Sequence, residues 1–111
     1  MYPRRGEVWW VSFDPSVGGE IRKTRPALIV SNNAANAALN RLVVVPFTSR
    51  TTNLYPGEAL VTLNNEAQSK AKADQVSTVS KQRLRGKMGI LSATDLAAVE
   101  KAILQHLAIR H

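Results

Sequence analysis

The chain lacks cysteine entirely and has only two histidines, His106 and His111, both near its C-terminus. Without cysteine it forms no disulfide, thiolate nucleophile or cysteine-bound zinc site. Two histidines at one end argue against a histidine-ligated metal site and against a paired-histidine ribonuclease mechanism. We therefore expect neither a metal nor another cofactor.

Long apolar runs are also missing. No stretch approaches the roughly 18 apolar residues of a membrane-spanning helix, and residues 1–5 lack the apolar core of a secretory signal. Aromatic residues make up only 5% of the chain. We expect no membrane association, and a cytoplasmic location.

Basic residues are abundant. The 111 residues carry a net charge of +7, and 44% of them are apolar, which suits a single globular domain spanning residues 1–111. Within residues 66–87, Glu66 and Asp74 are outnumbered by basic side chains, namely Lys70, Lys72, Lys81, Arg83, Arg85 and Lys87. This charge favours an anionic partner, either nucleic acid or an acidic protein.

β-favouring segments dominate the pattern. We predict strands over residues 6–13, 25–32, 41–48, 57–63, 71–79 and 84–91. The first strand has apolar bulk on both faces, so either a partner subunit covers one face or the strand lies between two sides of a small barrel. Pro46 falls late in its strand and predicts an edge or a bulge. Residues 33–40 fit either one or two helical turns or a long loop.

A helix is predicted at the C-terminal end. Ser92 and Asp95 are spaced as in a capping box, and the helix should run to about residue 109. One apolar stripe should face the core, and His106 should lie at the surface; the stripe comprises Leu96, Val99, Ile103 and Leu107. Together these elements predict a curled antiparallel sheet closed by a C-terminal helix.

Residues 20–26 hold the main chemical candidates. Arg25 precedes a proline and should be extended at the start of a strand, beside a loop with Gly18 and Gly19. It is either a phosphate-gripping arginine or an ordinary strand-start arginine with its charge in water. Glu20 could orient the guanidinium or transfer a proton, or it could be an exposed loop acid.

Two further polar groups follow. Thr48 and Ser49 end a buried strand with hydroxyls, which solvate a loop or donate to phosphate oxygens. Gln75, after Asp74, either makes a structural hydrogen bond or reads a base edge.

Five motifs occur in order along nearly the whole chain. They are Arg5-Gly6-Glu7-Val8-Trp9, Asp14-Pro15 through Gly19-Glu20, Arg25-Pro26-Ala27-Leu28-Ile29-Val30, Val45-Pro46-Phe47-Thr48-Ser49, and Ala73-Asp74-Gln75-Val76 with Lys81-Gln82-Arg83-Leu84. In sequence, order and spacing they resemble the MazF/PemK family of toxin endoribonucleases. The resemblance implies a mainly β fold, an SH3-like curved antiparallel β-barrel with a C-terminal helix. It also implies a homodimer that binds single-stranded RNA and a MazE-like antitoxin.

The resemblance further implies metal-independent RNA cleavage by attack of the 2′-hydroxyl on the adjacent phosphate. The family's catalytic arginine and threonine fall on Arg25 and Thr48, and its loop glutamate falls on Glu20. RNA-binding positions are implied at Gly19, Lys23, Pro46, Ser49, Asp74 and Gln75. Two alternatives from other classes are a topoisomerase-poisoning toxin of the CcdB type, and a noncatalytic basic barrel that binds nucleic acid.

Overall fold

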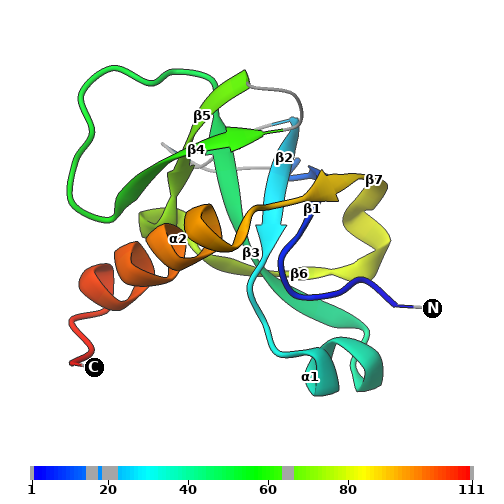
Figure 1. Ribbon diagram of the computed structural model, residues 1–111. Coiled ribbons are helices and arrows are strands. Elements are labelled where there is room, and N and C mark those ends of the chain that lie inside the picture. Colours follow the sequence, from blue (N-terminus) through cyan, green and yellow to red (C-terminus); the bar gives the residue numbers. More distant parts are fainter. Residues whose placement is uncertain (1, 15–17, 19–22, 64–66, 111) are drawn as a thin grey trace.

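The computed structural model describes residues 2–14, 18, 23–63 and 67–110, and this part of the chain forms a curled sheet with one long helix (Figure 1). The strands are β1 (Glu7–Ser12), β2 (Thr24–Ile29), β3 (Arg41–Thr48), β4 (Glu58–Leu63), β5 (Ala67–Lys72), β6 (Ser77–Ser80) and β7 (Leu84–Ile90). The helices are α1 (Asn33–Ala38) and α2 (Ala93–His106), with 3₁₀ turns η1 (Ala73–Gln75) and η2 (Lys81–Arg83). The predicted mainly β architecture is confirmed.

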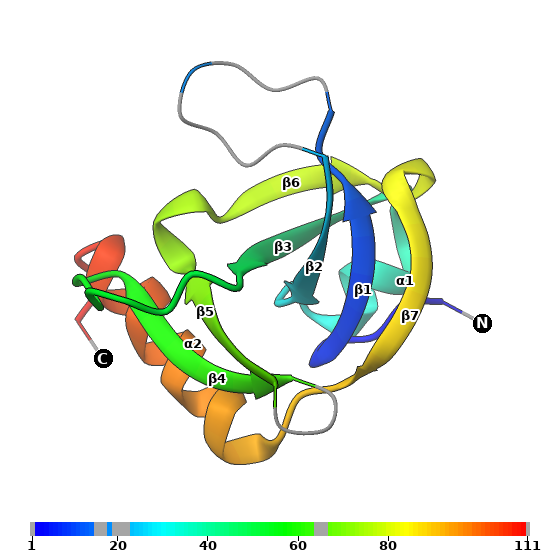
Figure 2. The ribbon, with the colours of Figure 1, turned by 90° about the horizontal axis from the view of Figure 1, so that it is seen from above.

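Strand β3 is the centre of the sheet. The described strands follow the order β4-β5-β3-β2-β1-β7, with β6 also on β3, and all the pairs are antiparallel. One edge of β3 pairs with β2; the other pairs first with β6, up to Val44, and then with β5, from Phe47. Figure 2 shows the sheet curving round on itself as a result.

Pro46 occupies the point where β3 changes partner. It is fully buried and lies opposite Ala27 of β2, so it is not on an outer edge strand; the predicted edge or bulge corresponds to a local gap in pairing on the other side of β3. A proline has no N–H for the ladder. It is tolerated inside β3 because neither β5 nor β6 pairs with β3 at this residue.

Two apolar clusters lie on the two faces of β1. Val8 belongs to the cluster that contains Leu28 and Phe47, whereas Val11 belongs to the cluster of Ala27, with Trp9 packed against it. The chain therefore covers both faces of β1 itself, as in the small-barrel interpretation. Trp10, 41% exposed, is the exception.

Helix α2 closes the sheet. The Ser92 hydroxyl accepts a hydrogen bond from the Asp95 N–H at 3.1 Å, as predicted, but the Asp95 carboxylate accepts from the Thr62 N–H of β4 at 2.9 Å. Val99 and Ala102 are buried. The helix ends at His106, and Leu107 is 50% exposed, so the predicted stripe is wrong at its last member.

The predicted strand over residues 71–79 is also wrong. It is divided among the end of β5, the turn η1 and β6. The alternation of polar and apolar residues stops at Asp74-Gln75, two polar residues in succession, but no glycine or proline marks the break. At residues 33–40 the helical alternative holds, because the Asn32 side chain accepts from the Ala35 N–H at 2.8 Å and caps α1.

None of the helices in the described part of the chain is both long and apolar enough to span a membrane.

Candidate functional site

Arg25 and Thr48 lie on the neighbouring strands β2 and β3. The pairing of these strands ends at Ala27 and Pro46, and each of the two residues lies two positions beyond that pair. Both line the same pocket. The structure therefore brings together the two predicted catalytic residues, which are 23 positions apart in the sequence.

A pocket of about 230 Å³ lies where these strands end. Arg25 and Thr48 are among its lining residues, with Ser49 next to them. The other lining residues are Trp10, Thr24, Pro26, Phe47 and Ser69. Sequence reasoning missed Trp10 as a site residue, because apolar bulk on both faces of the first strand indicated that both faces are covered, whereas Trp10 is exposed.

The segment before Arg25 is held by a specific set of backbone contacts. Lys23 has a left-handed backbone with φ of 63°, and its N–H donates to the Asp14 carboxylate at 2.9 Å. The Phe13 N–H donates to the Lys23 carbonyl at 2.9 Å. Arg83 donates to the Ser12 carbonyl at 3.1 Å and also to the Asp14 carbonyl. These contacts fix the chain at the point where it enters β2.

The charge of Arg25 is exposed to solvent, and the described residues supply it with no ion pair. A guanidinium at this position is available to an anion from outside. Gly19 and Glu20, the other predicted residues of this loop, lie outside the described residues.

The Thr48 hydroxyl is partly oriented by its own strand end. Its oxygen accepts a hydrogen bond from the Arg50 N–H at 3.3 Å. This bond uses a lone pair of the hydroxyl, so the hydroxyl hydrogen can still be donated. Ser49 follows and is exposed.

The remaining predicted residues lie apart from this pocket. Pro46 is buried and offers no surface to a ligand. Asp74 is exposed on η1, where its carboxylate lies 3.8 Å from the Lys72 ammonium, and Gln75 is half-buried beside it. Neither Asp74 nor Gln75 is among the residues that line the pocket.

A buried charge cluster lies on the other side of Thr48. The Glu58 carboxylate, 4% exposed, is 3.1 Å from the Lys70 ammonium and 2.8 Å from that of Lys72. It also accepts from the Tyr55 N–H at 2.9 Å. Burial alone raises the pKa of Glu58, but the hydrogen bonds from Lys72, Tyr55 and Lys70 outweigh it and lower the pKa from 4.5 to about 2.

We expect Glu58 to make the free energy of unfolding depend on pH in the acidic range. Because the pKa of Glu58 is lower in the folded state, its contribution is complete above pH 4.5 and is lost as the pH falls toward 2. The shift corresponds to about 3 kcal/mol. Urea unfolding from pH 6 downward should show wild type losing stability relative to Glu58→Gln over this range; a constant difference between the two proteins would contradict the assignment.

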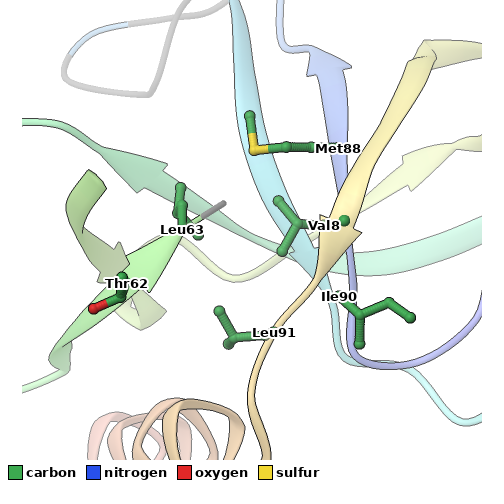
Figure 3. A pocket seen from close by; sticks show the side chains of 7 residues that line it. Val8, Thr62, Leu63, Met88, Ile90 and Leu91 are labelled. Carbon is green, nitrogen blue, oxygen red and sulfur yellow. The ribbon is translucent and has the colours of Figure 1, made fainter. Parts of the chain in front are cut away.

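Two other hollows carry less chemistry. One, of about 40 Å³, lies between β4 and β7, and Figure 3 shows it lined mainly by aliphatic and thioether side chains, among them Val8, Leu63, Met88 and Leu91. A groove of about 600 Å³ runs along α2, with Ile103 and Leu104 in its lining. In the part of the chain that is described, His, Asp and Glu side chains form no group of three or more able to hold a metal ion.

These features define a small basic β-barrel protein with an arginine and a threonine that line one pocket. Residues 4–107 match the family model described as PemK-like, MazF-like toxin of type II toxin-antitoxin system. The chain belongs to this family.

Relatives and solved structures agree with the family match. The chain is 39% identical to endoribonuclease MazF9 of Mycobacterium tuberculosis, over 94% of this chain and 95% of that one. It is 32% identical to the endoribonuclease toxin MazF of Escherichia coli K12, over 91% and 90%. The crystal structure of MazF from Deinococcus radiodurans matches with a TM-score of 0.86 at 27% identity, over 97% of this chain and 98% of that one.

Proposed function

We propose that this protein is the toxin of a type II toxin–antitoxin system and acts as an endoribonuclease on single-stranded RNA, messenger RNA included. The observation that carries the proposal is that Arg25 and Thr48 line one pocket, in a chain of the PemK/MazF family. Cleavage at short sequences in cellular RNA would inhibit translation and growth.

The proposed reaction is a transesterification that needs no metal. The ribose 2′-oxygen attacks the adjacent phosphorus as its proton leaves, and the bond from phosphorus to the 5′-oxygen breaks. The 5′-oxygen gains a proton. The products are a 2′,3′-cyclic phosphate and a 5′-hydroxyl, so atoms and charge balance without an oxidant or a cofactor.

Arg25 and Thr48 would stabilise the transition state. The reacting phosphate gathers negative charge on its non-bridging oxygens, to which the guanidinium can donate two parallel hydrogen bonds and the Thr48 hydroxyl one more. Arginine is a poor base because its pKa is above about 12. The proton transfers therefore fall to Glu20 or to water.

RNA binding would extend from this pocket over the neighbouring residues. Lys23 and the Ser49 hydroxyl are exposed beside it and suit phosphate contacts. The exposed Trp10 ring offers a surface on which a base can stack. Asp74 and Gln75 would recognise a base further along the bound RNA. The buried Pro46 would act only by shaping β3.

The proposal includes two protein partners. A MazE-like antitoxin would block the RNA site; a mycobacterial endoribonuclease with the same fold has been solved in complex with its cognate antitoxin, with a TM-score of 0.82 at 24% identity, over 98% of each chain. A second copy of the chain would form a homodimer. The chain covers both faces of β1 itself, so the dimer rests on family membership. We place the protein in the cytoplasm.

A single 2′-deoxy substitution tests the reaction. An RNA that the protein cleaves at one site is resynthesised with deoxyribose immediately 5′ to the scissile phosphate. Because the attacking oxygen is then absent, we expect cleavage at that site to fall below detection, whereas a deoxyribose two nucleotides away leaves it. Undiminished cleavage of the substituted RNA would mean that another nucleophile attacks.

A further inference from the structure

Lys70 occupies an unusual position for a lysine. Its side chain is only 7% exposed, and its backbone pairs with that of Thr48, so Lys70 emerges on the same face of the sheet as the proposed catalytic hydroxyl. Lysine is rarely buried in this way unless its charge is paired. Thr48 and Lys70 thus form a cross-strand pair of β3 and β5, and Thr48 shares its pocket with Arg25 of β2.

The Lys70 ammonium has three oxygen acceptors within reach. Its nitrogen lies 3.1 Å from the Glu58 carboxylate and 3.4 and 3.3 Å from the backbone carbonyls of Thr52 and Asn53. The Tyr55 ring lies 5.7 Å from the nitrogen, within range of a cation–π contact. Two of these three acceptors belong to the loop of residues 49–57, which connects Thr48 to β4, and the third is Glu58, the first residue of β4.

The loop of residues 49–57 depends on such side-chain contacts for its conformation. It contains no helix or strand, and Asn53 has a left-handed backbone with φ of 59°. Asparagine tolerates this conformation and allows the sharp turn of the backbone there. The loop also keeps two large apolar side chains in water, Leu54 at 55% and Tyr55 at 60% exposure.

Stability alone is a weak reason for the buried charges. A buried ion pair costs desolvation, and an apolar replacement of similar size is often equally stable. What an apolar residue cannot do is bind two loop carbonyls at fixed positions. Glu58 completes the arrangement, because it holds both Lys70 and the Tyr55 N–H.

We infer that Lys70 is a positioning residue, which fixes the 49–57 loop beside Thr48 so that Leu54 and Tyr55 contact the bases next to the scissile phosphate. Lys70 thereby sets which RNA sequence is cleaved, without touching the RNA. This inference rests on the proposed ribonuclease function.

The test compares Lys70→Met with wild type, with Lys101→Met as a control that removes an exposed lysine of α2. Hydrogen exchange of the loop amides is measured first, on the protein without RNA. We expect exchange at residues 50–55 to rise about tenfold or more in Lys70→Met, the size expected when hydrogen bonds to a charged group are lost, with the amides of β3 unchanged. Unchanged loop exchange would overturn the anchoring role.

The second readout is discrimination between the preferred RNA site and its single-base variants. We expect the ratio of their kcat/KM values to fall about tenfold or more in Lys70→Met, with kcat on the preferred site changed less, and with both intact in Lys101→Met. A loosened loop with undiminished discrimination would overturn the specificity role. If wild type leaves RNA intact, the ribonuclease proposal fails, while the exchange result still judges the anchoring.

A second variant covers failure of Lys70→Met to fold. Lys70→Arg keeps the charge, but its planar fork cannot reproduce the three-way contact of the compact ammonium. We expect it to fold, with a smaller rise in loop exchange and a smaller loss of discrimination in the same direction. Wild-type values for both would overturn the inference.

Discussion

Arg25→Ala is expected to lower RNA cleavage about a hundred- to a thousandfold, the typical loss for one donor to a transition-state oxyanion. The side chain is exposed at the start of β2 and forms no ion pair with the described residues, so its removal should change the free energy of unfolding by less than about 0.5 kcal/mol. Rates at saturating RNA and urea denaturation measure the two effects.

Two controls make the Arg25 result specific. Arg41→Ala removes another exposed arginine, from the far end of β3 opposite Ser80, and should retain near wild-type cleavage. Arg25→Lys keeps the charge but loses the planar pair of donors, and we expect it to recover only part of the rate. Equal losses of cleavage rate in Arg25→Ala and Arg41→Ala would mean that Arg25 contributes only to the overall positive charge and has no specific role in the reaction.

Thr48→Val alone is expected to lower the rate of RNA cleavage about a hundredfold. Valine keeps the shape and the β-branching that suit the end of β3, and removes only the hydroxyl. Since that hydroxyl also accepts from the Arg50 N–H, Thr48→Ser is the matched control. Serine restores both the donor and the acceptor, and should cleave within a few fold of wild type. A serine variant as slow as the valine variant would mean that the methyl group, through packing, matters more than the hydroxyl.

Much of the fold could be predicted because its signals are local. The alternation of Ala59, Val61 and Leu63, the apolar run before Pro46, and the Ser92 cap each reflect neighbouring residues, and β3, β4 and the start of α2 lie close to their predicted places. The prediction of one strand over residues 71–79 was wrong because the turn η1 interrupts this stretch, and no glycine or proline marks the turn. The turn η1 lies between β5 and β6, which pair with different parts of β3, and this pairing depends on residues that are distant in the sequence.

The site could be predicted only through family resemblance. Residues alone left Arg25 open between two interpretations, because its approach to Thr48 depends on the register between β2 and β3. The Glu58–Lys70 contact is equally invisible, because two charged residues twelve positions apart carry no sign of burial. Trp10 was overlooked because the sequence does not show which of the two adjacent tryptophans is packed. Trp9 packs against a core cluster, whereas Trp10 is exposed.

The most direct test of the account is a digestion of long, mixed-sequence RNA by the purified protein in excess EDTA, with Arg25→Ala alongside. We predict discrete cuts at one short sequence, with 2′,3′-cyclic phosphate and 5′-hydroxyl ends, in the wild-type sample alone. Intact RNA in the wild-type sample, or identical cuts in both samples, would contradict a metal-independent ribonuclease that acts through Arg25.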